Sequence, residues 1–120
     1  MTTELIQRHC EPCTSKTPPL KPPEIFKLHE KTSDWAITTG HKLVRTFTCP
    51  DFMAAISFVN RVAEVAEAED HHPNITIDYR KVTFTIWTHA IDDLSENDFI
   101  LAAKIDDAYA QGGFAGAGRE

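Results

Sequence analysis

The sequence predicts an α+β fold, a single two-layer domain in which three helices pack on one face of a four-stranded antiparallel sheet. Three helical segments, at residues 25–31, 51–69 and 95–111, are separated by two pairs of short β-branched or alternating segments. This gives the order α-β-β-α-β-β-α. The chain has 120 residues, of which 42% are hydrophobic, which is the size of one domain with a small core.

The first 21 residues form a predicted leader. They contain Thr, Ser, Pro and scattered charges but no apolar stripe, so we expect residues 1–21 to be extended or disordered. Two consecutive prolines then suit the start of a helix, and residues 25–31 would form a short helix with Ile25 and Leu28 as its buried contacts. The domain proper is expected at residues 22–113.

β-Branched and aromatic residues dominate the next two runs, residues 35–38 and 42–48, and the Thr39-Gly40-His41 turn between them predicts a hairpin. A long amphipathic helix is then predicted at residues 51–69, because apolar side chains recur there at spacings of three and four. Its expected buried stripe consists of Phe52, Ala55, Ile56, Val59, Val62, Ala63 and Ala66.

The Asp-His-His-Pro segment at residues 70–73 ends this helix, because the residue before a proline is pushed out of helical geometry. Alternation of apolar and polar side chains predicts two more strands, at residues 75–79 and 82–87. A Ser-Glu-Asn-Asp segment at residues 95–98 resembles a capping box for the last helix, a pair of glycines would end it, and residues 114–120 would be a flexible tail. That helix would bury Phe99, Leu101, Ala102, Ile105 and Tyr109.

One face of the predicted sheet has no helix left to cover it. This face meets water, a ligand or another subunit, and its tryptophan is the side chain best suited to a subunit contact. We therefore expect a homo-oligomer. If the alternation holds, the face carries Thr76, Asp78, Thr83, Thr85, Trp87 and His89.

Charge and hydropathy exclude several classes of partner. Eighteen acidic residues against twelve basic ones give a formal charge of −6, which repels phosphate backbones and anionic lipid surfaces, so we expect no direct nucleic acid binding and no membrane partner. No apolar run approaches the roughly 18 residues of a membrane span, and the N-terminus lacks the pattern of a signal peptide. We expect a cytoplasmic protein.

The three cysteines are an odd number, which favours reduced thiols over a disulfide framework. Cys10 and Cys13 form a C-x-x-C beside His9 in the predicted leader. A structural zinc site normally needs a second pair of ligands close by, and the sequence offers none there. The pair is therefore interpreted as mobile thiols, with metal binding as the alternative.

Three histidines are expected close together: His71 and His72 directly follow the long helix, and His89 ends the last strand. They fit a structural role, as a helix cap and a solvated strand end, and they also fit a three-histidine zinc site with Glu67 as base. A third interpretation is general acid/base catalysis, because the free pKa of histidine, about 6.5, leaves both protonation states available near neutrality. Glu67 and Asp70 could then orient the imidazoles.

The stretch Glu67-Ala68-Glu69-Asp70-His71-His72-Pro73, followed by Tyr79, Val82 and Thr88-His89, resembles the signature of the pterin-4a-carbinolamine dehydratases. The resemblance covers about residues 24–109. It implies that His71, His72 and His89 line a pterin pocket as catalytic residues, that Glu67 occupies the matching acidic position, and that no cofactor or metal is needed. Substrate-binding residues are then expected at Glu67, Asp70, Pro73 and Thr88.

The reaction implied by this resemblance removes water from 4a-hydroxytetrahydropterin to give a quinonoid dihydropterin, which supports tetrahydropterin recycling for aromatic amino acid hydroxylation. His72 and His89 are the preferred acid/base pair, with His71 assisting at the leaving hydroxyl. Because relatives associate, a homodimer or homotetramer is expected. Animal relatives also act as dimerisation partners of a transcription factor, so the alternative is a non-catalytic dimerisation or interaction module of the same fold.

Overall fold

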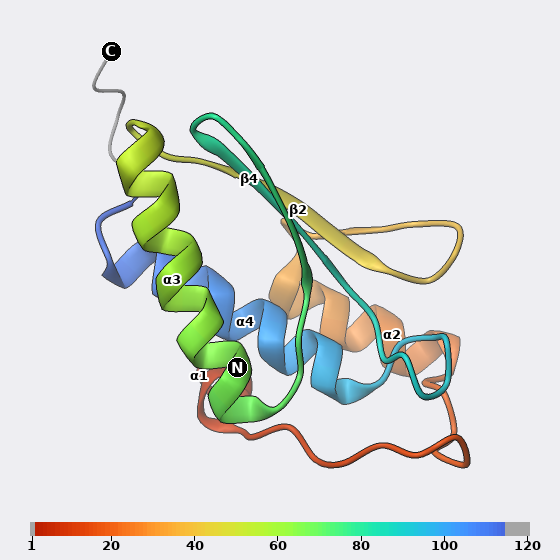
Figure 1. Cartoon of the computed structure of the whole chain (residues 1–120). Coiled ribbons are helices and arrows are strands. Elements are labelled where there is room, and N and C mark those ends of the chain that lie inside the picture. Colours follow the sequence, from red (N-terminus) through yellow and green to blue (C-terminus); the bar gives the residue numbers. More distant parts are fainter. Residues whose placement is uncertain (1, 115–120) are drawn as a thin grey trace.

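A single antiparallel sheet carries its strands in the spatial order β1-β2-β4-β3 (Figure 1). The computed structural model describes residues 2–114. Consecutive strands pair within each hairpin, and β2 and β4 pair along their full lengths, from Leu43 opposite Ile86 to Thr48 opposite Lys81. The elements, in chain order, are α1 (Thr2–Gln7), α2 (Pro22–His29), the 3-10 helix η1 (Glu30–Thr32), β1 (Ala36–Ile37), β2 (Leu43–Thr48), α3 (Phe52–Glu69), β3 (Asn74–Asp78), β4 (Lys81–Ile86) and α4 (Glu96–Gln111).

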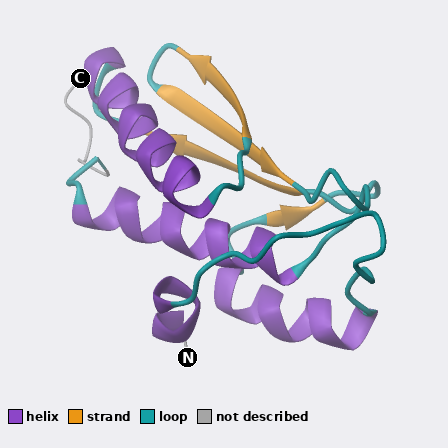
Figure 2. Cartoon of the chain, turned by 60° about the horizontal axis from the view of Figure 1, so that its bottom comes forward, coloured by secondary structure: helices purple, strands orange, loops and turns teal. Residues whose placement is uncertain are grey.

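The main core lies between the sheet and the helices, which gather on one side of it (Figure 2). Along β4, Val82, Phe84 and Ile86 are buried, whereas Thr83 and Thr85 on the other face are only partly covered. This alternation is what a strand with one covered face requires. The predicted fold class, with α2, α3 and α4 as its three helices, is confirmed.

The long helix α3 has a buried stripe rotated from the predicted one. Ala55, Phe58, Val62 and Ala66 are buried, whereas Phe52 is 44% exposed and Ala63 is also exposed. Ile56 and Val59 are only partly buried. Apolar residues cover two neighbouring faces of this helix, and periodicity alone does not say which face meets the sheet. Phe58, which the predicted stripe omitted, is the centre of the actual contact because it packs edge-on to Phe47 and Phe84.

The predicted leader contains a helix, α1, which differs from the expectation of an extended or disordered segment. Leu5 is 1% exposed and packs against Ile100 and Ala103 of α4, on the side of that helix away from the sheet (Figure 2). The reason lies in α4 itself. Its residues 99–103 are apolar on all sides, so α4 has a second face that another element must cover.

The end of the chain is described only as far as Phe114, which packs against Phe58 with ring centroids 5.2 Å apart. The rest of the predicted tail, residues 115–120, lies outside the described residues. Within residues 2–114, none of the helices combines the length and the apolar character needed to cross a bilayer.

Candidate active site

The C-terminal end of α3 determines where the two adjacent histidines lie. Asp70 adopts left-handed backbone geometry, with φ 52°, and its N–H donates to the last carbonyls of the helix. The His71 N–H also turns back, to the Ala66 carbonyl at 3.1 Å. Beyond this turn the two side chains diverge: His71 reaches a buried carboxylate of α4, and His72 reaches Glu67 on the surface of α3.

His71 is paired with Asp98, the first buried acid of α4. The Nε2 atom of His71 lies 2.7 Å from Asp98 Oδ1, and the side chains are 12% and 0% exposed. Because a carboxylate accepts, the Nε2 atom of His71 carries the hydrogen, and in the neutral imidazole Nδ1 is left with a lone pair. Asp98 thereby fixes both the ring orientation and the tautomer of His71.

Asp98 is also the centre of a buried polar network. Its Oδ2 accepts from the Thr88 hydroxyl at 2.9 Å and from the Ser95 N–H at 2.8 Å, and the Thr88 and Ser95 hydroxyls lie 2.7 Å apart. Ser95 and Asp98 form the capping box that starts α4, as predicted. The same carboxylate therefore caps the helix, ties it to the end of β4 through Thr88, and holds His71.

His72 lies in a more open setting. Its Nε2 is 2.5 Å from Glu67 Oε2, with the two side chains 52% and 78% exposed. An ion pair in such a solvated position contributes little to stability, on the order of 0–1 kcal/mol. Glu67 can orient the His72 ring without fixing it as firmly as Asp98 fixes His71.

His89 packs against Trp87 in a tilted arrangement, with ring centroids 4.3 Å apart and an angle of 33° between the planes. On Trp87 lies the Lys42 ammonium, 4.1 Å from the ring centroid. Trp87 was expected to be a subunit contact on the open sheet face. Within the chain, the Trp87 ring lies beside His89 and contacts Lys42, and the subunit contact stays a prediction.

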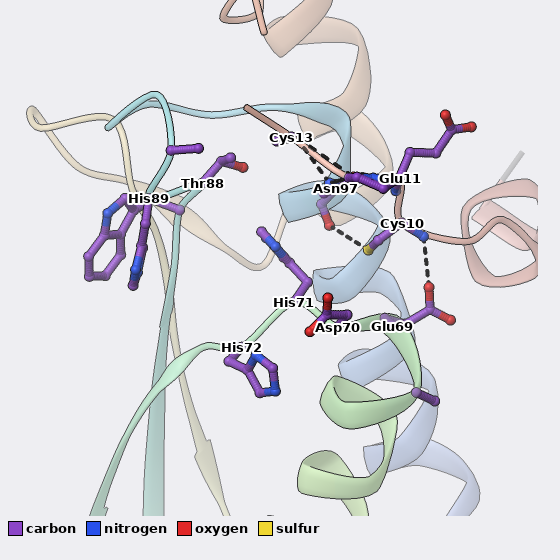
Figure 3. A pocket seen from close by; sticks show the side chains of 14 residues that line it. Cys10, Glu11, Cys13, Glu69, Asp70, His71, His72, Thr88, His89 and Asn97 are labelled. Atoms are coloured by element: carbon purple, nitrogen blue, oxygen red, sulfur yellow. Dashed lines mark hydrogen bonds between the residues drawn. The ribbon is translucent and has the colours of Figure 1, made fainter. Parts of the chain in front are cut away.

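The three histidines line one pocket of about 520 Å³, a volume typical of small-molecule sites (Figure 3). Of the expected substrate-binding residues, Asp70 and Thr88 also line it, whereas Glu67 and Pro73 do not. The Thr88 hydroxyl is committed to Ser95 and Asp98, so Thr88 is a support of the site. The full lining is Cys10, Glu11, Pro12, Cys13, Ala68, Glu69, Asp70, His71, His72, Trp87, Thr88, His89, Ala90 and Asn97.

Residues 10–13, which we call the strap, supply a pocket wall that sequence reasoning missed. Burial raises the pKa of the Cys10 thiol to about 12, and the Glu69 and Asp98 carboxylates add to the effect, so this thiol stays protonated at neutral pH. Burial also acts to raise the pKa of Glu69, but hydrogen bonds from the Cys10 N–H and His9, together with Lys104, hold that pKa below its usual value. The ionised Glu69 therefore stabilises the folded state at pH values above the pKa that Glu69 has in the unfolded chain. This contribution to stability is lost as the pH falls through the lowered pKa of the folded state.

Asp98 and Asn97 were also missed as site residues, although the sequence showed the capping box that contains them. A useful signal was available: Asp98 is followed at once by five apolar residues, which indicates that the first turn of its helix enters the core. Such a carboxylate needs buried donors, and His71 supplies one of them. Within residues 2–114, no three His, Cys, Asp or Glu side chains converge in the manner of a metal site.

Comparison with known proteins gives a match to one family over most of the chain. Residues 18–108 match the family described as pterin 4 alpha carbinolamine dehydratase. This segment includes every residue of the Asp98 network and all three pocket histidines. The strap lies before it.

Two bacterial relatives share the description "Putative pterin-4-alpha-carbinolamine dehydratase". The protein from Rubrobacter xylanophilus is 41% identical over 104 residues, which cover 87% of this chain and 97% of the relative. The protein from Rickettsia bellii is 45% identical over 107 residues, which cover 88% and 95%. A crystal structure of a transcriptional coactivator/pterin dehydratase from Brucella melitensis superposes with a TM-score of 0.72 at 28% identity, and the match covers 76% of this chain and 98% of the Brucella chain.

Proposed function

Because the chain belongs to the pterin 4 alpha carbinolamine dehydratase family, we propose that it removes water from 4a-hydroxytetrahydropterin by histidine acid/base catalysis and so supports tetrahydropterin recycling for aromatic amino acid hydroxylation in the cytoplasm. The observation that supports this most is that three histidines, two just after α3 and one just after β4, line one pocket. Imidazole suits this role because it exchanges protons near neutral pH.

The proposed step breaks the bond from C4a to its hydroxyl and removes the hydrogen of the neighbouring ring nitrogen. One histidine donates a proton so that the hydroxyl leaves as water, and another accepts the ring N–H proton. The electron pair of that N–H bond becomes the second bond between nitrogen and C4a. Atoms and charge balance, and no electrons leave the pterin.

The surroundings of the histidines suit different parts of this step. We keep His72 and His89 as the principal acid/base pair, since both lie at the open side of the pocket where a proton exchanges with solvent afterwards. His71, held rigidly by Asp98 with Nδ1 as acceptor, would bind the leaving hydroxyl group. Trp87 lines the same pocket and packs against His89, so it would hold that imidazole in place.

The direct test is consumption of freshly generated 4a-hydroxytetrahydropterin by the purified protein, followed by absorbance. Turnover above the spontaneous rate supports the dehydratase. Binding of a pterin without any acceleration, measured at the same protein concentration, would refute it.

We expect the activity to survive exhaustive treatment with a chelator, because the proposed step uses proton transfer and two imidazole Nε2 atoms are already engaged by carboxylates. The rate before and after chelation is the measurement. Loss of turnover that added zinc restores would instead support the three-histidine zinc site.

A second candidate function, a dimerisation or interaction module, is favoured by an exposed apolar surface at the edge of the sheet. Ile75 and Ile77 of β3 are 37% and 39% exposed, and Tyr79 beyond them is 65% exposed and stacks on Phe52. The Brucella neighbour is described as a coactivator as well as a dehydratase. A stable complex without turnover would favour the module over the enzyme.

The same surface leads us to propose a homo-oligomer, with the contact at β3 in place of Trp87. β3 is an edge strand whose five residues are all exposed, and an apolar edge with unpaired backbone groups readily pairs with a second copy. We expect Ile77→Lys to shift the protein towards monomer in sedimentation velocity at micromolar concentration. Phe26→Ser on α2, which removes another exposed large apolar side chain, 70% exposed and away from β3, is the control. A wild-type protein that sediments as a monomer would rule out this interface.

A further inference from the structure

The strap closes one side of the histidine pocket, yet the family match begins only at residue 18 and so assigns it no role. Figure 3 shows Cys10, Glu11 and Cys13 beside Asn97, across the pocket from His89, with His71 between the two sides. A substrate that reaches His71 would therefore lie next to the strap.

Asn97 holds the strap through both backbone groups of Glu11. The Glu11 N–H donates to Asn97 Oδ1 at 2.9 Å, and Asn97 Nδ2 donates to the Glu11 carbonyl at 2.6 Å. Asn97 is 7% exposed, so these bonds are shielded from competing water. The Asn97 side chain thus satisfies both backbone groups of Glu11, as the backbone of a neighbouring β-strand would.

Both thiols of the C-x-x-C contact the same residue. Cys10 Sγ donates to the Asn97 carbonyl at 3.6 Å, and Asn97 Nδ2 lies 3.3 Å from Cys13 Sγ as a donor. The raised pKa of Cys10 keeps that thiol protonated and able to donate. Because two residues separate the cysteines, one thiol contacts the main-chain carbonyl of Asn97 and the other contacts its side-chain amide. The two thiols therefore hold the strap against Asn97 from both ends.

Further contacts fix the strap, and α1 before it, against the helices that carry the site. The Cys10 N–H donates to Glu69 Oε1 at 2.7 Å, at the end of α3 two residues before His71. Upstream, Leu5 is buried on α4, and Lys104 Nζ donates to the Ile6 carbonyl at 2.6 Å. The strap is therefore held by the same two helices that hold His71 and Asp98.

We propose that the strap is a substrate-contacting wall of the pterin pocket and that Asn97 is the positioning residue that holds it in place. This inference rests on the proposed function. A contact made equally in the bound substrate and in the transition state strengthens binding without raising the rate of the chemical step. Loss of the strap contact should therefore raise KM and leave kcat almost unchanged.

Protection of Cys13 from alkylation tests the contact in the unmodified full chain. Cys49 is buried and Cys10 stays protonated, so iodoacetamide should label Cys13 first, as followed by mass spectrometry. The probe is a 7,8-dihydropterin, which has no hydroxyl at C4a and cannot react. At saturation we expect it to slow Cys13 labelling by about tenfold or more, as for a group shielded by its ligand.

Calorimetry on the same sample separates the outcomes. If the dihydropterin binds but Cys13 labels at its original rate, the strap does not contact the ligand, and this inference is overturned while the proposed function stands. If no pterin binds at all, the proposed function fails, and the inference fails with it.

Kinetics of Asn97→Ala test the positioning role. We expect KM to rise by about tenfold and kcat to change by less than about twofold, because a uniform binding contact is lost. Arg8→Ala, just before the strap, is the matched control. Its partner Glu96 is half-exposed and neither residue lines the histidine pocket, so both constants should stay at the wild-type values. A fall in kcat with KM unchanged would show that Asn97 acts through its neighbour Asp98, and the strap would lose its role.

Discussion

Replacing His72 or His89 by alanine is expected to lower kcat by about a hundredfold or more, because each variant removes a group that transfers a proton in the proposed transition state. The fold should tolerate both changes. His72 has a side chain that is 52% exposed, and His89 lies on the surface beyond the end of β4, so neither truncation opens a core cavity. The change in unfolding free energy should stay within about 0.5 kcal/mol, as for surface substitutions.

The measurements are single-turnover kinetics and thermal unfolding of each variant beside His41→Ala. His41 is a fitting control because it also pairs with a carboxylate, Asp93 at 2.9 Å, on an exposed loop outside the pocket. If the His72 and His89 variants unfold easily while their folded fraction keeps full activity, the two histidines are structural, and the acid/base proposal is wrong.

The order of the four strands and of α2, α3 and α4 was predictable because each of these elements carries its own local pattern. The capping box at Ser95 and Asp98, the alternation of Val82, Phe84 and Ile86, and the proline after His72 act within a few residues, so the sequence contains them directly. The face of α3 that packs against the sheet was not predictable in this way. Phe58 and Ile56 both lie on apolar faces of that helix, and only packing against Phe47 and Phe84 selects Phe58.

The grouping of the histidines was predictable, but their supports were not. His71 and His72 follow one helix and His89 ends a strand, which places them at one end of the sheet. The bond from His71 to Asp98 joins residues 27 positions apart, and no local pattern encodes it. The strap was missed because the helix before it is held by Leu5, which packs on the side of α4 away from the sheet. Only the unbroken apolar run that begins at Phe99 indicates that this side of α4 is covered.

Substitutions of Asp98 are expected to have the largest effect on stability. Asp98→Ala would leave the His71 ring, the Thr88 hydroxyl and the Ser95 N–H without their buried acceptor, and it would remove the capping box of α4. Unsatisfied buried donors cost about 1–3 kcal/mol each, and a lost cap costs about 1 kcal/mol, so we expect a loss on the order of 3 kcal/mol after relaxation. Urea unfolding of the variant and the wild type gives this number.

Asp98→Asn separates the positioning role of Asp98 from this structural one. The amide has nearly the shape of the carboxylate, so the loss of stability should be smaller. Its NH2 group, however, can donate to His71 Nε2 and so move the ring hydrogen to Nδ1, which removes the acceptor that would face the substrate. We expect kcat to fall by about a hundredfold and nitrogen NMR of the imidazole to report the changed tautomer. Asp93→Asn, at the His41 pair, should alter neither quantity in the pocket. An Asp98→Asn protein with full activity and an unchanged His71 tautomer would show that Asp98 caps the helix and does nothing for the chemistry.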